Sequence, residues 1–239
     1  MLYKGIPKRT VNFCMRDFND IVNLSLSGSV KEGEYINKFE DVFKSYIGSK
    51  EAVAVSSGRF ALELILEGLG LRRGDKVVLS SFNFKGVPLS LINAGFIPVF
   101  VDADEQTFQM DINKIEEKID GNTKAIIATH LFGQPCSLKP IENLAKKHNL
   151  HIVEDCAHAL GAFYGNGHVG VFGKAGFFSL TASKTINTSF GGVVVTNDTI
   201  LAAKIRTRVS RNGFPDDGYV IKKRLMTYIY SLLTDRTFY

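Results

Sequence analysis

Short apolar runs alternate with helix-patterned segments from residue 35 to residue 153, and this alternation limits the possible folds more than any other feature of the chain. Runs of three to five apolar residues are typical of buried strands, whereas apolar residues at helical spacing indicate amphipathic helices. We expect strands at 52–55, 77–79, 97–101, 125–128 and 151–153, and helices at 35–47, 59–69, 87–94, 112–119 and 138–148. Such an order builds parallel βαβ units.

Two further apolar runs, 175–179 and 193–196, follow without a full helix between them. We therefore expect these two strands to pair like a hairpin, which makes the otherwise parallel sheet mixed. Two more helices are expected at 200–209 and 220–233. The predicted fold class is α/β, with a mostly parallel mixed sheet covered by helices.

The chain has 239 residues, of which 45% are apolar, and this is enough for one substantial core. Residues 1–30 are expected to form an N-terminal segment, and residues 31–213 one large domain. An apolar stripe lies on the last predicted helix and consists of Ile221, Leu225, Ile229 and Leu232. Because the sequence stops shortly after this stripe, we expect that residues 214–239 begin a C-terminal region and that the protein is truncated.

The cysteines and the first residues indicate a reducing compartment. The three cysteines, Cys14, Cys136 and Cys156, are odd in number and have no paired spacing, which is typical of free thiols. The first residues lack the apolar run of a signal peptide, and no uncharged apolar stretch is long enough to span a membrane. We expect a cytoplasmic protein.

The net charge of the chain is unevenly distributed. Residues 199–239 contain eight basic and three acidic residues, so the net charge of +5 resides there and residues 1–198 are balanced. This argues against a nucleic-acid-binding surface across the fold. The basic end is either a solvated helix or a surface for phosphates or anionic lipid, which leaves weak peripheral membrane association open.

Three groups of polar residues lie at or near predicted strand ends, where ligands bind in open α/β sheets. Residues 56–59 lie between a strand and a helix, so they can bind an anion such as phosphate, or Ser57 can simply cap the helix. Asp155 ends an apolar run and needs a partner, either a pyridinium or an arginine in a structural ion pair. Lys184 precedes a Gly-Gly turn and is either solvated or a desolvated nucleophile and general base.

Asp155 and Lys184 together favour one kind of chemistry, in which the lysine forms a Schiff base and the carboxylate holds a protonated ring nitrogen. His158 is either a core histidine or a contact of the same ring. Cys136, Cys156 and His158 are too sparsely arranged for zinc, and no metal site is predicted. A Ser-His-Asp hydrolase is not supported, because the chain has no nucleophile elbow.

Eight stretches carry a resemblance to a known family, and they read GEYINKFEDVF, VSSGRFALEL, SSFNFKGVP, AGFIPVFVDAD, THLFGQPC, VEDCAHALGA, FFSLTASK and RVSRNG. From about Gly33 to Gly213 the chain resembles the N-terminal two-thirds of the DegT/DnrJ/StrS-type family of pyridoxal-phosphate-dependent sugar aminotransferases. The resemblance implies a three-layer α/β/α domain, the large domain of fold type I PLP-dependent transferases. It also implies that residues 31–213 bind pyridoxal 5'-phosphate and that the family's small C-terminal domain is largely absent.

The resemblance also implies roles for individual residues. Lys184 matches the Schiff-base lysine, and Asp155 matches the carboxylate that keeps the ring nitrogen protonated. Phe84 matches the aromatic residue that stacks on the ring, and His158 matches the position near the ring hydroxyl. The phosphate-binding positions are those of Ser57, Gly58, Arg59 and Ser179.

Three departures from the family pattern stand out. Arg59 replaces the usual threonine, so a guanidinium stands where a hydroxyl contacts the phosphate. Phe190 replaces the glutamate that commonly follows the lysine within a Gly-Glu-Gly-Gly segment. Residues 216–239 do not match the segment that approaches the neighbouring subunit.

The implied function is transamination of a nucleotide-linked keto-sugar, with glutamate as amino donor, for surface polysaccharide or glycan biosynthesis. The resemblance also implies a homodimer, because the family's active sites are shared across the interface. A sugar 3-dehydratase is an alternative, but Lys184 speaks against it, because histidine replaces the lysine in that branch. A non-catalytic binding or regulatory protein with the same fold is a second alternative.

Overall fold

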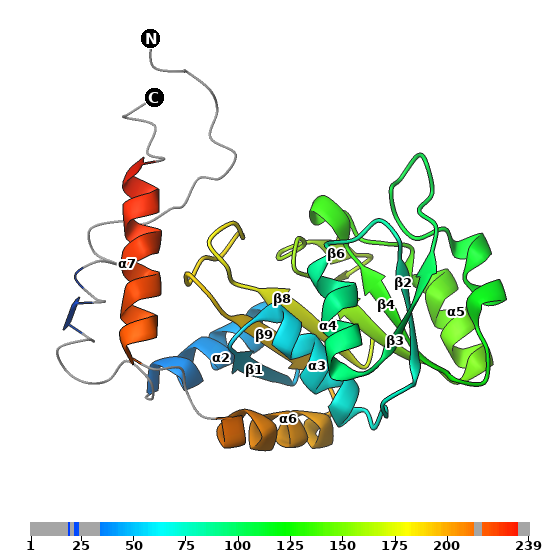
Figure 1. Ribbon diagram of the computed structural model, residues 1–239, viewed down its shortest axis with the longest axis horizontal. Helices are drawn as coiled ribbons and strands as arrows, with labels where there is room; N and C mark the ends of the chain where they lie inside the picture. Colours follow the sequence, from blue (N-terminus) through cyan, green and yellow to red (C-terminus); the bar gives the residue numbers. More distant parts are fainter. Residues whose placement is uncertain (1–18, 20–21, 24–33, 213–216, 234–239) are drawn as a thin grey trace, which may run out of the picture.

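The computed structural model describes residue 19 and residues 22–23, 34–212 and 217–233. Except for those first three residues, the predicted N-terminal segment 1–30, with Cys14, lies outside the described residues. Figure 1 shows a central sheet between two layers of helices. Its strands are β1 (Glu51–Val55), β2 (Lys76–Ser80), β3 (Ile97–Val101), β4 (Thr123–Thr129), β5 (His151–Asp155), β8 (Ala175–Ser179) and β9 (Gly192–Thr196). The helices are α2 (Glu34–Ile47), α3 (Gly58–Gly68), α4 (Gly86–Ala94), α5 (Leu138–His148), α6 (Thr199–Asn212) and α7 (Asp217–Leu233).

The seven strands follow the order β1-β9-β8-β5-β4-β2-β3. The pairs β5·β8, β4·β5, β2·β4 and β2·β3 are parallel, and β9 runs antiparallel to both β1 and β8. The predicted mixed sheet and the hairpin-like pairing of the two late strands are therefore confirmed. A short hairpin of β6 (Phe163–Tyr164) and β7 (Gly167–His168) lies outside this sheet and was not predicted.

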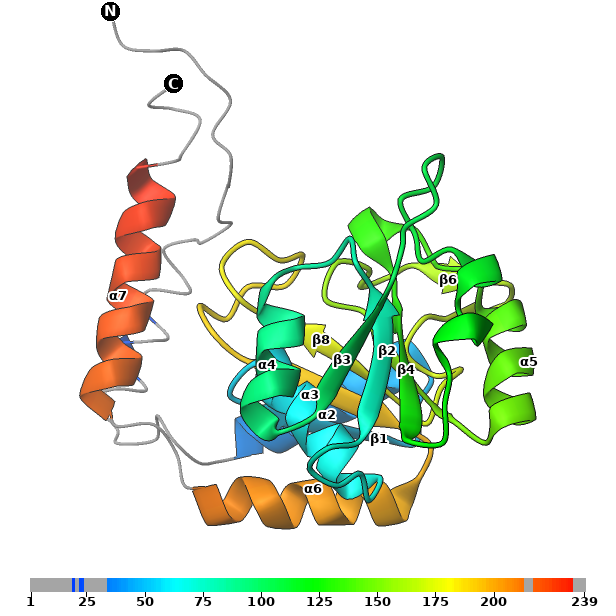
Figure 2. The same cartoon turned by 45° about the vertical axis from the view of Figure 1, so that its right-hand side comes forward.

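In the strands other than the edge strand β3, alternate residues face two different core layers, as the pleat of a strand requires. One face packs against α3, α4 and α6, with Val53, Leu79 and Val153 among its buried residues. The opposite face packs against α5 around Ile126 and against α2 around Val193. This arrangement confirms the three-layer α/β/α class (Figure 2).

The predicted helix at 112–119 is wrong. The segment forms two 3₁₀ turns, η1 (Ile112–Lys114) and η2 (Glu116–Lys118), joined at the fully buried Ile115. The Asp111 side chain accepts a hydrogen bond from the Asn113 amide and caps the first turn. Over eight residues, apolar spacings of three and four fit successive 3₁₀ turns as well as an α-helix, so the periodicity could not distinguish them.

Helix α7 confirms the predicted last helix. Leu225 and Ile229 of the predicted stripe are 49% and 42% exposed, so this face is not covered within the described chain. The rings of Phe190 and Tyr219 lie 6.2 Å apart between centroids, so the segment after Lys184 contacts the start of α7. No helix in the described ranges is both long and apolar enough to cross a membrane.

Gly176 of β8 supplies the first testable prediction. A Cβ at this position would lie 2.6 Å from the Gly170 Cα and 2.7 Å from its carbonyl oxygen. Because these are backbone atoms that cannot move aside cheaply, we expect Gly176→Ala to lower the free energy of unfolding by about 1–3 kcal/mol. Urea denaturation measures this loss.

Gly121→Ala is the matched control, since no heavy atom lies within 4 Å of a Cβ there. We expect the control to change the unfolding free energy by less than about 0.5 kcal/mol. Equal stability of both variants would contradict the close packing of β8 on the Gly170 segment.

Candidate active site

The candidate residues gather where the parallel strands end. Asp155 is the last residue of β5 and lies in register with Thr129 of β4 and Phe177 of β8. After β2, the Asn83 side chain donates a hydrogen bond to the Thr129 hydroxyl at 3.1 Å, which holds the neighbouring Phe84 segment at the same edge. This edge is the one at which open α/β sheets bind ligands.

Ser57, Gly58 and Ser179 come together at the start of α3. A Cβ at Gly58 would lie 3.3 Å from the Ser179 Cβ, and a backbone bridge joins Ser57 to Gly191. A Cβ at Gly192 would lie 2.6 Å from the Ser57 carbonyl carbon, so only glycine allows this approach. The contacts place two hydroxyls beside the free amides of a helix N-terminus, which suits a phosphate group.

Ser57 also caps the start of α3, the structural alternative to anion binding that the sequence left open. Its Oγ accepts a hydrogen bond from the Phe60 amide at 3.2 Å and caps α3. A hydroxyl that accepts one bond keeps its own hydrogen for donation, so capping and anion binding are compatible. Arg59, in the first turn, is exposed and adds a positive charge where the helix dipole already favours anions.

Lys184 lies in a closed loop between β8 and β9. The Thr188 amide donates to the Leu180 carbonyl at 3.0 Å, and the Lys184 amide donates to the Thr181 carbonyl at 2.9 Å. Lys184 itself is half-buried. Its positive charge opposes the rise that burial causes in the pKa of Asp155, and it adds to the fall that burial causes in the pKa of His158. Asp155 and His158 therefore both lie within electrostatic reach of Lys184.

Asp155 is a carboxylate in a dry environment. Its side chain is only 5% exposed, and Oδ1 accepts a hydrogen bond from the Ala157 amide at 3.0 Å. Burial raises the pKa of Asp155, and the Ala157 hydrogen bond and the nearby His130 and Lys184 oppose this rise. A buried carboxylate of this kind favours a cationic partner.

His158 and Phe84 lie at the rim. The His158 ring stacks on Phe132 at 5.8 Å between centroids, and partial burial together with the Lys184 charge lowers the pKa of His158. Phe84 is 59% exposed, and its ring covers Gly86, where a Cβ would lie 2.4 Å from it. Phe84 thus lies at the same edge of the sheet as Asp155, with its ring against Gly86 at the start of α4.

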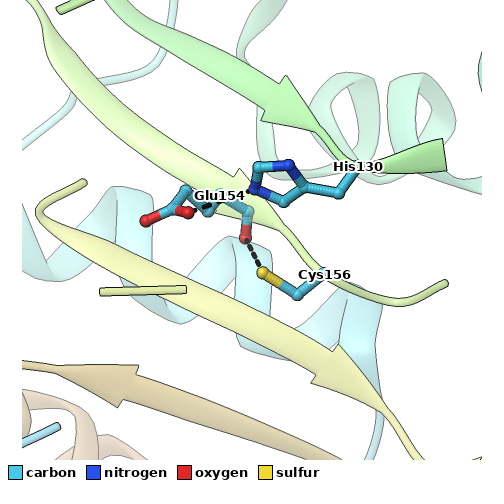
Figure 3. A group of neighbouring side chains, drawn as sticks. All are labelled: His130, Glu154 and Cys156. Atoms are coloured by element: carbon cyan, nitrogen blue, oxygen red, sulfur yellow. Dashed lines mark hydrogen bonds and ion pairs between the residues drawn. The ribbon is translucent and has the colours of Figure 1, made fainter. Parts of the chain in front are cut away.

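Sequence reasoning missed one buried group beside this site, the cluster of His130, Glu154 and Cys156 (Figure 3). Glu154 and His130 are both 0% exposed, and the His130 Nε2 lies 3.1 Å from a Glu154 carboxylate oxygen. The signal was a second carboxylate, Glu154, directly after the apolar run at 151–153, because a charged residue that continues a buried strand needs buried partners. The zinc set that was considered, Cys136, Cys156 and His158, did not include this combination.

Comparison with known proteins decides the family. Residues 15–228 match the DegT/DnrJ/EryC1/StrS aminotransferase family. The chain belongs to this family. The resemblance read from the sequence motifs is confirmed, and the family's cofactor is pyridoxal phosphate.

Individual members of the DegT/DnrJ/EryC1/StrS family match the chain over its larger part. The chain is 43% identical over 170 residues to GDP-perosamine synthase of Escherichia coli O157:H7, covering 71% of this chain and 47% of that protein. It is 36% identical over 190 residues to the spore coat polysaccharide biosynthesis protein SpsC of Bacillus subtilis, covering 80% and 49%. The chain thus spans about half the length of these relatives.

Solved structures of similar proteins show the same fold. An aminotransferase from Psychrobacter cryohalolentis superimposes with a TM-score of 0.80 at 34% identity, covering 84% of this chain and 52% of that one. An E. coli GDP-4-keto-6-deoxy-D-mannose-3-dehydratase with bound hydrated PLP superimposes with a TM-score of 0.78 at 28% identity, covering 89% and 59%.

The residues of this chain fit pyridoxal phosphate. The phosphate needs an anion site, and the start of α3 offers backbone amides with the hydroxyls of Ser57 and Ser179 packed around Gly58. A protonated pyridine nitrogen needs a buried carboxylate, which Asp155 can supply. An aldehyde needs an amine, and Lys184 lies near Asp155.

Proposed function

We propose that this chain carries the cofactor-binding domain, residues 31–213, of an enzyme that transfers an amino group from glutamate to a nucleotide-linked keto-sugar. The pairing of buried Asp155 with Lys184 at the carboxyl ends of the strands is the observation that carries the proposal. The names of the relatives support the substrate class, because they include a GDP-perosamine synthase and a polysaccharide biosynthesis protein. Surface polysaccharide or glycan biosynthesis is the proposed context.

The proposed roles follow from the chemistry of each side chain. Pyridoxal phosphate, when bound, supplies an electron sink for the carbon that loses a proton. Asp155 holds a proton on the ring nitrogen, since a buried carboxylate stabilises the adjacent cation. The Lys184 amine would hold the cofactor aldehyde covalently, with release of water, and, once displaced by the substrate amine, would serve as the base that carries the proton.

The remaining predicted residues bind and orient. Ser57, Ser179 and the α3 amides hold the phosphate, and Arg59 adds charge to that site. Phe84 would cover one face of the ring, for which its side chain would have to leave Gly86, and His158 would contact the ring hydroxyl.

A homodimer and a cytoplasmic location are part of the proposal. Cys136 and Cys156 are free and buried, which supports a reducing compartment. A dimer would bring a second subunit to the edge where the candidate residues lie.

The reaction test is a half-reaction followed by a full turnover. The purified chain is loaded with pyridoxal phosphate and given glutamate, and conversion to pyridoxamine phosphate is followed by its absorbance. A GDP- or dTDP-linked 4-keto-6-deoxy sugar is then added, and the product is identified by mass spectrometry. The proposal predicts an amino-sugar nucleotide.

Two other outcomes would overturn the proposal. Loss of a hydroxyl without gain of nitrogen would indicate a dehydratase, to which the chain is structurally similar at 28% identity. Binding of the cofactor without pyridoxamine formation would indicate a non-catalytic binding protein.

Arg59 yields a prediction about cofactor affinity. A guanidinium forms charge-assisted hydrogen bonds with phosphate, so we expect Arg59→Ala to weaken pyridoxal phosphate binding. The loss should be only roughly three- to tenfold, because Arg59 is exposed and solvent screens its charge. The loss should shrink at high salt. Equilibrium titration at two salt concentrations measures both effects.

Arg72→Ala is the control, because Arg72 is also exposed but lies beyond the end of α3, whereas Arg59 lies in its first turn. Its cofactor affinity should equal that of the unmodified chain. Unchanged affinity in Arg59→Ala at low salt would remove Arg59 from the phosphate site.

A further inference from the structure

Glu154 is a buried carboxylate for which the proposed function has no use. Its Oε2 accepts hydrogen bonds from the His130 Nε2 at 3.1 Å and the Gly170 amide at 2.8 Å. Its Oε1 accepts from the amides of Phe172 and Gly173, each at 2.7 Å. Four donors match the four lone-pair sites of an ionised carboxylate, which only accepts. Glu154 is therefore fully satisfied as a charged group.

The three backbone donors come from one segment pressed onto β5. Gly170 has φ +104°, a conformation that side chains other than glycine rarely adopt. A Cβ at Gly173 would lie 2.6 Å from the Ile152 carbonyl oxygen. Both glycines let the segment approach β5 closely enough to direct its amides at Glu154.

His130 links Glu154 to its neighbour Asp155. The His130 Nδ1 accepts a hydrogen bond from the Cys136 amide at 3.1 Å, so the proton of the neutral ring is on Nε2 and points at Glu154. The backbone amide of His130 donates to the Asp155 carbonyl at 3.0 Å. One residue thus holds both the Glu154 side chain and the Asp155 main chain.

The cluster is a poor metal site, although ligand atoms of His130, Glu154 and Cys156 lie within 4.8 Å of one another (Figure 3). Both ring nitrogens of His130 already have partners, and a cation would have to replace the hydrogen bonds to Glu154. Burial raises the pKa of the Cys156 thiol well above its usual range, which disfavours the thiolate that metals bind. The cluster is a hydrogen-bond network.

We propose that Glu154 is a positioning residue that fixes the Asp155 carboxylate for the cofactor ring. Side chains of adjacent strand residues point to opposite faces of the sheet. The Glu154 side chain therefore holds the end of β5 from one face, and the Asp155 side chain lies on the other face, where it would contact the cofactor ring. Through His130 the anchor reaches the Asp155 carbonyl, so both sides of the strand end are held. The inference rests on the proposed function, in which Asp155 contacts the ring.

Glu154→Gln tests the network. Glutamine offers one acceptor oxygen and turns an NH₂ group toward N–H donors, so some of the four donors lose their partner. We expect the amides of Gly170, Phe172 and Gly173 to exchange faster with solvent. We also expect the ¹³C resonance of the Asp155 carboxyl to shift in the cofactor-free chain, and the affinity for pyridoxal phosphate to fall about tenfold.

Glu40→Gln is the matched control. Glu40 is also buried, accepting from the Ala54 amide at 2.7 Å and from Arg206 at 2.6 Å, but it belongs to α2. The control should lose stability and leave the Asp155 resonance and the cofactor affinity unchanged. A merely structural role of Glu154 predicts that both variants behave alike, and that result would overturn the proposal.

Further measurements test the positioning role of Glu154 if Glu154→Gln does not fold. They also separate this role from the proposed function. In the unmodified chain, ¹⁵N NMR must find the His130 proton on Nε2; a proton on Nδ1 would refute the network. His130→Gln keeps a donor for Glu154 and should retain the Asp155 resonance, whereas His130→Leu should not. Should the unmodified chain bind no pyridoxal phosphate, the proposed function fails, while the Asp155 resonance still decides the positioning role.

Discussion

Replacement of Lys184 by alanine is expected to abolish covalent cofactor binding and to lower the transamination rate by on the order of 10⁴-fold or more, because one amine serves as both nucleophile and proton carrier. The half-buried lysine lies close enough to Asp155 and His158 for its charge to favour the ionised form of Asp155 and the neutral form of His158. Among the described lysines, Lys184 is the one that acts on both groups. Visible absorbance of the loaded chain and the glutamate half-reaction measure the two losses.

Two further variants separate the chemistry of Lys184 from its charge. Lys184→Arg keeps a cation near Asp155 without a suitable nucleophile, and should fold normally but remain inactive. Lys174→Ala removes an exposed lysine at the opposite end of β8 and should retain absorbance and activity. Activity in Lys184→Ala close to that of the unmodified chain would refute the assigned role.

The second large effect is expected for Asp155→Asn. An amide cannot stabilise a proton on the ring nitrogen as a carboxylate does, so transamination should fall by roughly 10³-fold while the cofactor still binds Lys184. Steady-state kinetics together with the absorbance of the loaded variant test this combination. A variant with unchanged turnover would exclude Asp155 from the ring site.

Asp155→Asn should also stabilise the cofactor-free chain at neutral pH by about 1 kcal/mol. Functional residues often lower the stability of a protein, and their replacement then raises it. Burial raises the pKa of Asp155 above the unfolded value of about 3.9, so ionisation at neutral pH costs stability. Below that unfolded value the carboxyl is protonated in both states, and the difference should disappear. The Asn oxygen can still accept the Ala157 hydrogen bond.

Asp104→Asn is the control, because we expect it to change the stability of the chain at neutral pH in the opposite direction. Hydrogen bonds from Thr107 lower the pKa of Asp104, so its ionised form is favoured by folding and its loss should destabilise the chain at neutral pH. Urea denaturation at pH 7 and pH 3 compares the two variants. Destabilisation of the cofactor-free chain by Asp155→Asn at pH 7 would contradict the account of a costly buried charge.

The fold was predictable because the inner strands of its sheet are buried on both faces. Such strands are continuous apolar runs, and the runs at 77–79 and 125–128 lie inside β2 and β4 as expected. The strand ends were less clear, and β5 continues through Glu154 and Asp155, two residues beyond the predicted run. Those residues are charged, and their burial depends on the distant donors at His130 and 170–173.

The candidate site was predictable as a set of positions but not as a geometry. The end of a parallel strand is a known place for ligands, which brought Asp155 and Ser57 into consideration. The approach of Gly58 to Ser179 and of Gly192 to Ser57 depends on strand order, which local periodicity does not encode. The β6–β7 hairpin was missed for a different reason, because strands of two residues are too short to show a periodic pattern in the sequence.

The measurement that tests the central claim most directly is the location of the bound cofactor on the chain. The protein is incubated with pyridoxal phosphate, reduced with borohydride, digested, and mapped by mass spectrometry. The account predicts that the added pyridoxyl group is on the peptide that contains Lys184. Its absence, or its attachment to a different lysine, would contradict the account.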